Sequence, residues 1–272
     1  MFRQSWRPEG APRAAVANLH GLGDHSGLYP ALVDHLLGRG LAVHSFDLRG
    51  NGRSAGARGF VEEWRDYRDD LAHFLRLVRQ DEPGVPLFII GNSLGGLIAL
   101  DYASHAPGGI RGVIVVSTPL GRLGVPGPLL ALGRLLSRIW PRFSLETGMD
   151  LSGLARDPTV AERILADPLF HRRATARLST EVTATIARIQ AGAPAFSLPF
   201  LVLHGSDDRM VPPDGSRALI ARAGSSDKRL IEYPGAYHAL FADTGREQPL
   251  ADVSGWIEER LAPPLARAGT AG

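Results

Sequence analysis

Residues Pro86 to Asp101 read P-L-F-I-I-G-N-S-L-G-G-L-I-A-L-D, and the fold of the chain can be worked out from this stretch. Its first half is a short apolar run typical of a buried strand, and the run breaks at Gly91. After Gly95 and Gly96, apolar residues recur at helical spacing in an Ala-rich segment. The stretch therefore predicts a strand, a tight turn and a helix in immediate succession.

The tight turn carries the pattern G-x-S-x-G, with Ser93 between Gly91 and Gly95. This pattern is typical of a serine held exposed at a sharp strand-to-helix turn. Such a turn strains the serine, and glycine neighbours without a Cβ atom allow the chains to pass closely. The Ser93 hydroxyl is a weak nucleophile by itself, so catalysis would need a base from elsewhere in the chain.

Composition excludes several classes of protein. The 272 residues are 44% hydrophobic and 21% charged, as in one globular domain or one domain with an insertion. The formal net charge of +2 is too small to indicate a nucleic-acid partner. Without cysteine there are no disulfides, no thiol catalysis and no cysteine-ligated metal. No apolar run suits a signal peptide or a membrane span, so we expect a cytoplasmic protein.

Strand and helix patterns alternate along most of the chain. This alternation predicts a mostly parallel sheet with helices on both faces, an α/β fold. A long helix is expected from Phe60 to Val78, and Phe2 to Arg7 is expected to form a hairpin with the next strand. Besides the Ser93 strand, the expected strands are Ala14 to Leu19, Leu41 to Phe46, Val113 to Val116, Phe200 to Leu203 and Arg229 to Tyr233.

The alternation fails between Pro119 and about Pro194, where only helical patterns are found and no strand is expected. We therefore predict a helical cap insertion over 119–194, a core formed by 1–118 and 195–262, and a disordered tail over 263–272. The helical patterns of the insertion cover Leu129 to Trp140, Val160 to Leu165, Phe170 to Leu178 and Thr180 to Gln190.

Polar residues follow four of the expected strands, where the chemistry of parallel sheets gathers. Ser93 follows one strand, Asp207 and Asp208 follow another, and His238 follows the last. We predict Ser93 as the nucleophile and His238 as the general base and then acid. One of the two aspartates would accept the other imidazole N–H, and its neighbour could cap the following turn.

A developing oxyanion needs two backbone donors, and two N–H groups are candidates. Leu94 directly follows the nucleophile, and Leu22 lies in the loop that begins with His20 and closes an early strand. His20, Asp24 and His25 in this loop could suggest a metal site, but loop glycines lie between His20 and the other two and no further ligand cluster follows. We therefore expect neither a metal nor a cofactor.

Five short motifs lie along the chain and include several of the residues already named. They are His20 to Tyr29 (H-G-L-G-D-H-S-G-L-Y), Asp47 to Ser54 (D-L-R-G-N-G-R-S), Gly91 to Gly96 (G-N-S-L-G-G), His204-Gly205 with Asp208 and Val211, and Gly235 to His238 (G-A-Y-H). Taken together, these motifs resemble the monoacylglycerol lipase and lysophospholipase-like branch of the α/β-hydrolases, which includes serine aminopeptidase-like proteins. The resemblance implies Asp208 as the acid, and a mobile cap over an acyl pocket at 119–194. Asn92 and Asn51 stand where family members often carry His.

The resemblance implies a serine ester hydrolase that works through an acyl-enzyme on monoacylglycerols or similar medium-chain esters. The alternatives are a lysophospholipase, a short-chain esterase, a small amidase or peptidase, and a non-catalytic ligand-binding protein. The Leu-rich stretch from Leu129 to Trp140 suits an acyl chain and could touch a membrane surface transiently. The sequence leaves the oligomeric state open.

Overall fold

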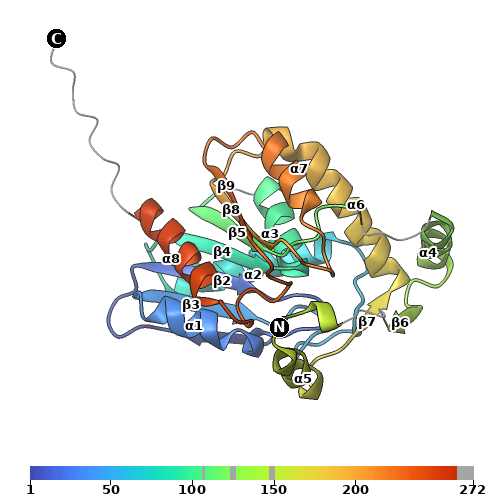
Figure 1. The fold of residues 1–272 in the computed structure, drawn as a ribbon, viewed down its shortest axis with the longest axis horizontal. Helices are drawn as coiled ribbons and strands as arrows, with labels where there is room; N and C mark the ends of the chain where they lie inside the picture. Colours follow the sequence, from blue (N-terminus) through green and yellow to red (C-terminus); the bar gives the residue numbers. More distant parts are fainter. Residues whose placement is uncertain (106–107, 123–126, 147–150, 262–272) are drawn as a thin grey trace, which may run out of the picture.

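A seven-stranded sheet forms the centre of the computed structural model, which describes residues 1–105, 108–122, 127–146 and 151–261 (Figure 1). The strand order is β1-β3-β2-β4-β5-β8-β9, and every neighbouring pair is parallel except β1 with β3. The strands are β1 (Arg3–Trp6), β2 (Ala14–Leu19), β3 (Leu41–Phe46), β4 (Leu87–Asn92), β5 (Gly112–Val116), β8 (Phe200–Gly205) and β9 (Lys228–Tyr233).

Helices cover both faces of this sheet, as the alternating pattern predicts (Figure 1). Along β2, Ala15 and Ala17 face one apolar core and Ala14 and Val16 face the other, because successive side chains of a strand point to opposite faces. Helices α2, α3, α6 and α7 contribute to the first core, and α1 and α8 to the second. The helices of the two layers are α1 (Pro30–Leu37), α2 (Arg65–Asp81), α3 (Leu94–His105), α6 (Ala176–Gly192), α7 (Asp214–Arg222) and α8 (Glu247–Leu261).

The prediction that the N-terminal strand forms a hairpin with the next strand is wrong. Strand β1 pairs antiparallel with β3, so that Arg3 lies opposite Phe46, and not with the next strand along the chain. Strand β2 is occupied on both edges by β3 and β4, which leaves the outer edge of β3 as the open position. Covering that edge also protects its unpaired backbone groups.

The insertion contains a small sheet that sequence patterns did not predict. Strands β6 (Ser144–Glu146) and β7 (Arg173–Thr175) pair antiparallel, and three residues are too few to show a period of two. The predicted helix over 170–178 is therefore wrong over 170–175, because this part contains β7 and helix α6 begins only at residue 176. The other elements are α4 (Gly127–Ile139), α5 (Pro158–Ala166) and the short 3-10 helices η1 (Ser26–Leu28), η2 (Leu151–Gly153) and η3 (Ala193–Ala195).

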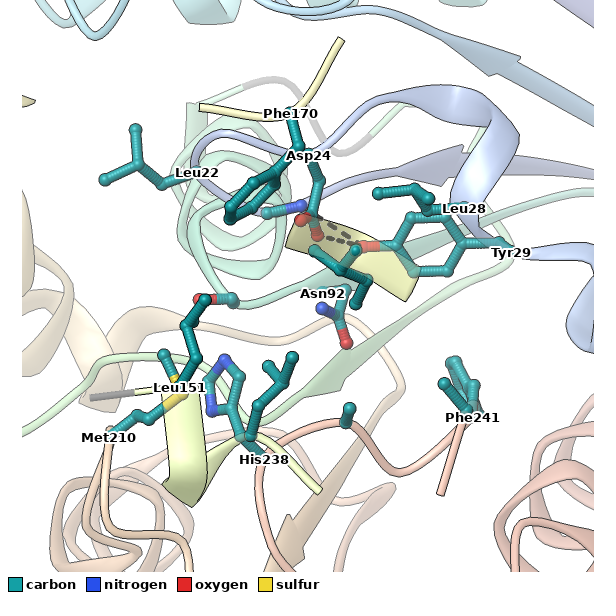
Figure 2. A pocket seen from close by; sticks show the side chains of 16 residues that line it. Leu22, Asp24, Leu28, Tyr29, Asn92, Leu151, Phe170, Met210, His238 and Phe241 are labelled. Atoms are coloured by element: carbon teal, nitrogen blue, oxygen red, sulfur yellow. Dashed lines mark hydrogen bonds between the residues drawn. The ribbon is translucent and has the colours of Figure 1, made fainter. Parts of the chain in front are cut away.

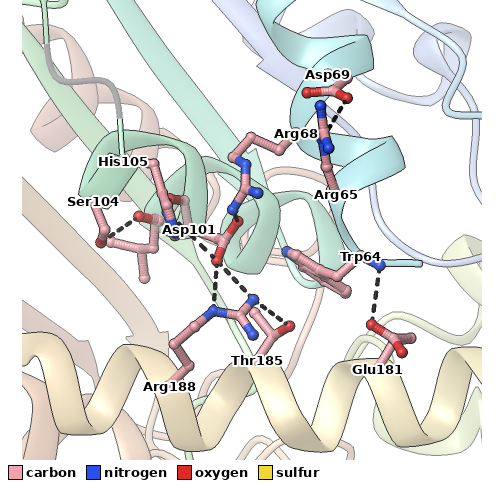
Figure 3. Close-up of polar contacts among 11 residues, drawn as sticks. Trp64, Arg65, Arg68, Asp69, Asp101, Ser104, His105, Glu181, Thr185 and Arg188 are labelled. Carbon is pink, nitrogen blue, oxygen red and sulfur yellow. Dashed lines mark hydrogen bonds and ion pairs between the residues drawn. The ribbon is translucent and has the colours of Figure 1, made fainter.

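Helix α6 ties the insertion to the core through polar contacts (Figure 3). The buried carboxylate of Asp101 on α3 accepts hydrogen bonds from Arg188 on α6, at 2.8 Å, and from Arg68 on α2, at 3.2 Å. Near the other end of α6, Glu181 accepts the backbone N–H of Trp64 at 2.9 Å. The last helix of the predicted cap thus packs as part of the core layer.

Two further expectations concern the C-terminal tail and membrane-spanning helices. The predicted tail over 263–272 lies outside the described residues. Among the described helices, none combines the length and the apolar character needed to cross a bilayer.

Candidate active site

Ser93 lies at the turn between β4 and α3 in a strained conformation. Its φ of 52° is in the left-handed region, and its N–H donates to the Val116 carbonyl of the neighbouring strand at 2.8 Å. The glycines around it are required by close approach. A Cβ atom on Gly91 would lie 2.5 Å from the Gly95 carbonyl oxygen, and one on Gly96 would lie 1.9 Å from Thr118 Oγ1.

His238 and Asp208 form a buried pair beside this turn. His238 Nδ1 lies 2.7 Å from Asp208 Oδ2, and a carboxylate can only accept, so the ring proton is on Nδ1. The His238 Nε2 atom is then free to accept a proton. Ser93 and His238 both line one pocket. Asp207 is exposed and accepts the Ser206 hydroxyl, so of the two adjacent aspartates only Asp208 reaches the histidine.

Hydrogen bonds keep the buried Asp208 carboxylate ionised. Burial opposes ionisation, but contacts from His204 and His238 outweigh it and lower the pKa of Asp208 to about 2. The second oxygen, Oδ1, accepts the backbone N–H groups of Met210 at 3.0 Å and Val211 at 2.8 Å. A carboxylate held in this way stabilises the imidazolium that forms when His238 takes a proton.

The His20 side chain fixes the direction of the Gly21–Leu22 peptide. His20 Nδ1 donates to the Gly21 carbonyl at 2.7 Å, and its Nε2 accepts the Leu48 N–H at 2.9 Å. Burial lowers the pKa of His20, which keeps this neutral tautomer. In a trans peptide the C=O and the N–H point in opposite directions. The Leu22 N–H therefore points away from His20.

The loop that carries Leu22 lies directly against the nucleophile. A Cβ atom on Gly21 would lie 3.3 Å from Ser93 Cβ, so the two residues are in contact across the turn. The second predicted donor, Leu94, is the first residue of α3, and its N–H has no carbonyl partner within that helix. The structure thus brings together every residue predicted for the site.

The pocket around Ser93 is mainly apolar, with a polar group on one side (Figure 2). Besides Ser93 and His238, the polar side chains are Asp24, Tyr29 and Asn92, and the Tyr29 hydroxyl donates to Asp24 Oδ2 at 3.0 Å. The apolar side chains come from both the core and the insertion. They are Leu22, Leu28, Leu151, Leu154, Ile164, Phe170, Met210, Ala239, Phe241 and Ala242.

The segment between α5 and β7 crosses the loop that carries Leu22. His171 donates its backbone N–H to the Gly23 carbonyl at 3.1 Å, and its Nε2 lies 2.9 Å from Asn51 Oδ1. The same Asn51 oxygen accepts the Gly23 N–H at 3.2 Å. Asp167 lies 3.0 Å from His25 Nε2. Asn51, which departs from the family pattern, therefore joins the insertion to the core.

Sequence patterns assigned no role to two residues that support the site. Ser117, directly after β5, has a φ of 47° and donates its buried hydroxyl to the His238 carbonyl at 2.7 Å. His204 Nε2 lies 2.8 Å from the Val211 carbonyl oxygen and 3.4 Å from Asp208, and its Nδ1 lies 2.9 Å from Ser216 Oγ. His204 belongs to the His204-Gly205 motif, whereas only the position of Ser117 after a strand could have drawn attention to it. Of the metal candidates, Asp24 and His25 have the separate partners Tyr29 and Asp167.

Known proteins are similar to this chain over nearly its whole length. The chain is 32% identical to a monoacylglycerol lipase of Mycolicibacterium smegmatis, covering 94% of this chain and 92% of that protein. It is 31% identical to the human monoglyceride lipase, covering 100% of this chain and 89% of that protein. The crystal structure of Paleococcus ferrophilus monoacylglycerol lipase superposes with a TM-score of 0.87 at 33% identity, covering 95% and 98% of the two chains.

These similarities confirm the resemblance and the fold class predicted from the motifs. The model of one family, described as Hydrolase_4, serine aminopeptidase S33, matches residues 10–245. That match spans the elbow at Ser93, the loop at Leu22 and the buried pair of His238 and Asp208. The chain is therefore a member of the Hydrolase_4 (serine aminopeptidase, S33) family of α/β-hydrolases.

Proposed function

We propose that this hydrolase cleaves monoacylglycerols through an acyl-enzyme on Ser93. The single observation that carries the proposal is that His238, paired with the buried Asp208, lines the same pocket as Ser93. His238 Nε2 takes the Ser93 proton as the hydroxyl oxygen attacks the ester carbonyl. The same proton then passes to the leaving glycerol oxygen, and water enters by the same route to release the fatty acid.

The N–H groups of Leu22 and Leu94 receive the carbonyl oxygen as it becomes negative. Both belong to backbone that is already held in place, one by His20 and one by the start of α3. Donors that need no reorganisation stabilise the tetrahedral intermediate more than the ester, so they lower the barrier. No cofactor enters this mechanism.

The charge of the pocket favours a neutral head group. Among the described residues that line it, Asp24 is the sole carboxylate and no arginine or lysine is present. A phosphate next to Asp24 would meet a like charge and find no cation to pair with. Glycerol hydroxyls instead can donate to a carboxylate. This favours monoacylglycerols over lysophospholipids, and the names of the relatives point the same way.

Hydrolysis of an ester panel tests the proposal. The panel holds monoacylglycerols of two to sixteen carbons, a lysophosphatidic acid, a lysophosphatidylcholine and an aminoacyl amide. We expect turnover of the glycerol esters, at least about 10-fold weaker kcat/KM for the phosphate esters, and labelling of Ser93 by a fluorophosphonate. Ser93→Ala should lose about 10⁴-fold or more in kcat and all labelling while keeping its Tm.

Faster turnover of the amide would favour a peptidase, because Asp24 could also hold a free ammonium group. Turnover limited to short chains would favour a general esterase. A folded wild-type protein that neither turns over nor is labelled would favour a ligand-binding role. Ester hydrolysis by Ser93→Ala would contradict the assignment of the nucleophile.

We also propose that helix α4 contacts lipid surfaces during substrate uptake. Several large apolar side chains on it or directly after it are exposed, among them Ile139 at 69% and Trp140 at 59%. Exposed arginines such as Arg138 lie on the same helix, and such a combination binds anionic interfaces. The other exposed apolar side chains of α4 are those of Leu129, Leu132 and Leu135.

Vesicle sedimentation tests this contact. The double variant Ile139→Gln, Trp140→Gln should lose most of its binding to anionic vesicles and keep its kcat on a water-soluble nitrophenyl ester. Leu165→Gln on α5 is the matched control. It also removes an exposed apolar side chain, at 51% exposure, but one that does not lie on α4. Equal binding of all three proteins would contradict a role for α4.

A further inference from the structure

The backbone of Gly21 is held at both its N–H and its C=O. The N–H donates to the Tyr29 hydroxyl oxygen at 3.3 Å, and the carbonyl accepts from His20 Nδ1 at 2.7 Å. Gly21 supplies the carbonyl half of the peptide whose other half is the Leu22 N–H. Since a peptide unit is planar, restraints on Gly21 are also restraints on the direction of that N–H.

A carboxylate fixes the direction of the Tyr29 hydroxyl. The hydroxyl proton goes to Asp24 Oδ2 at 3.0 Å, because a carboxylate can only accept (Figure 2). The lone pairs of the same oxygen then remain for the Gly21 N–H. Tyr29 is 7% exposed, and burial together with the Asp24 charge raises the pKa of its phenol, so the proton stays in place.

Of these three residues, Gly21 also contacts the nucleophile. A Cβ atom on Gly21 would lie 3.1 Å from Asp24 Oδ2 and 3.3 Å from Ser93 Cβ. A shift of the Gly21 backbone by a few tenths of an ångström would therefore change the distance between the Leu22 N–H and the oxyanion that forms at Ser93. Small misplacements of this kind reduce catalysis strongly.

We propose that Tyr29, with its hydroxyl oriented by Asp24, is a positioning residue that holds the Gly21–Leu22 peptide in the geometry needed for oxyanion stabilisation. The proposal rests on the proposed ester hydrolysis at Ser93. It gives a role to a buried phenol at the start of α1 and to a carboxylate that the triad does not use.

Tyr29→Phe tests the proposal because it removes one oxygen and leaves the ring. We expect kcat to fall about 10- to 100-fold with KM changed less than about 2-fold, as for a group that acts only in the transition state. Affinity for a trifluoromethyl ketone, which forms an oxyanion on Ser93, should fall by a similar factor. Affinity for a non-hydrolysable ether analogue of monoacylglycerol, which forms none, should stay the same.

The chain offers a matched control in Tyr233→Phe. Tyr233 is also a buried tyrosine, at 9% exposure, and its hydroxyl also donates to an aspartate, Asp252 Oδ2, at 2.8 Å. Tyr233 is not among the residues that line the pocket. This variant should lose a similar amount of stability and leave kcat and both affinities within about 2-fold of the wild type.

Asp24→Asn provides a second route if Tyr29→Phe is too unstable at the assay temperature. Asparagine can still accept the tyrosine proton but lacks the charge, so we expect a smaller loss of ketone affinity, about 3- to 10-fold. Unchanged ketone affinity in the folded variants, with an active wild type labelled on Ser93, would overturn the positioning role alone. An inactive, unlabelled wild type would instead overturn the proposed hydrolysis and this proposal with it.

Discussion

The two walls of the pocket are built differently. On the core side, the Ser93 turn, the Gly21 loop and Asp208 follow fully buried strands of one sheet, and His238 follows the partly buried β9 of the same sheet. On the insertion side, the residues that line the pocket, Phe170 among them, lie on short helices or in the segments that connect these helices. The core wall is dense with internal hydrogen bonds, whereas helix α4 of the insertion leaves large apolar side chains in solvent.

This difference separates chemistry from substrate access. Catalysis needs groups held in place to within a fraction of an ångström, and buried strand ends provide that rigidity. Entry of a long acyl chain needs a wall that can move. Beyond α6, the polar contacts between the insertion and the core include those of Asp167, His171 and Thr175 to the loops of the core, and that of Arg156 to Asp243. The comparison predicts that changes on the core wall act on kcat and changes on the insertion act on substrate uptake.

The largest effect is expected from the acid on the core wall. Asp208→Asn should reduce kcat by about 10³- to 10⁴-fold, because the amide no longer selects the imidazole tautomer that leaves Nε2 free. Asp207→Asn should stay within about 2-fold, because Asp207 is exposed and its side chain accepts a hydrogen bond from a serine hydroxyl. Steady-state kinetics on one monoacylglycerol measures both. The reverse order of effects would exchange the two assignments.

A smaller effect is expected on stability, where substitutions in the core and in the insertion should change the free energy of unfolding by different amounts. Leu97→Ala removes a fully buried side chain of α3 and should lower the free energy of unfolding by about 2–5 kcal/mol. Leu132→Ala on α4 removes a side chain that is 49% exposed and should change it by less than about 0.5 kcal/mol. Urea denaturation measures both values. Similar losses at the two positions would mean that α4 is packed as firmly as the core.

The smallest effect concerns pH and the contact between insertion and core. His171 Nδ1 accepts the Arg173 N–H at 3.1 Å, an acceptor role that protonation removes. Burial, with repulsion from Arg58, lowers the pKa of His171 to about 4. A histidine whose folded pKa is depressed contributes most above its unfolded pKa near 6.5, and that contribution is lost as the pH falls through about 4.

The insertion should therefore loosen at higher pH than the triad. The Asp208 contribution is complete above the ordinary pKa of 3.8 and is lost only as the pH falls through about 2. Hydrogen exchange from pH 7 to pH 4 should show rising exchange at the insertion before the core strands. His171→Gln, which can still donate to Asn51, should flatten this dependence. Simultaneous loss of protection in both regions would show that they open as one unit.

Several features could be predicted from local sequence alone. The turn at Ser93 is marked by glycines whose Cβ atoms would clash, and the buried strands are marked by continuous apolar runs. The insertion boundaries remain a prediction, and α6 shows why they are hard to define. Its residues repeat at helical spacing like the rest of the insertion, yet Arg188 reaches Asp101 in the core layer.

Features that depend on strand order could not be predicted in the same way. The pattern near Arg3 indicates a strand but not its partner, because β3 becomes its neighbour only when β2 is enclosed. The choice between Asp207 and Asp208 came from family spacing. The structure supplies the physical reason, since one side chain turns inward to His238 and its neighbour turns to solvent.

The sequence by itself determined the fold class, the strained elbow and the chain order of a serine, an aspartate and a histidine after successive strands, because steric demands and periodicity are encoded in adjacent residues. Only the tertiary structure decided which groups support them. Tyr29 meets Gly21 and Asp24, and His171 meets Asn51, through hydrogen bonds whose partners are set by the packing of whole elements. Such bonds depend on distance and angle, and neither is written in the spacing of residues along the chain.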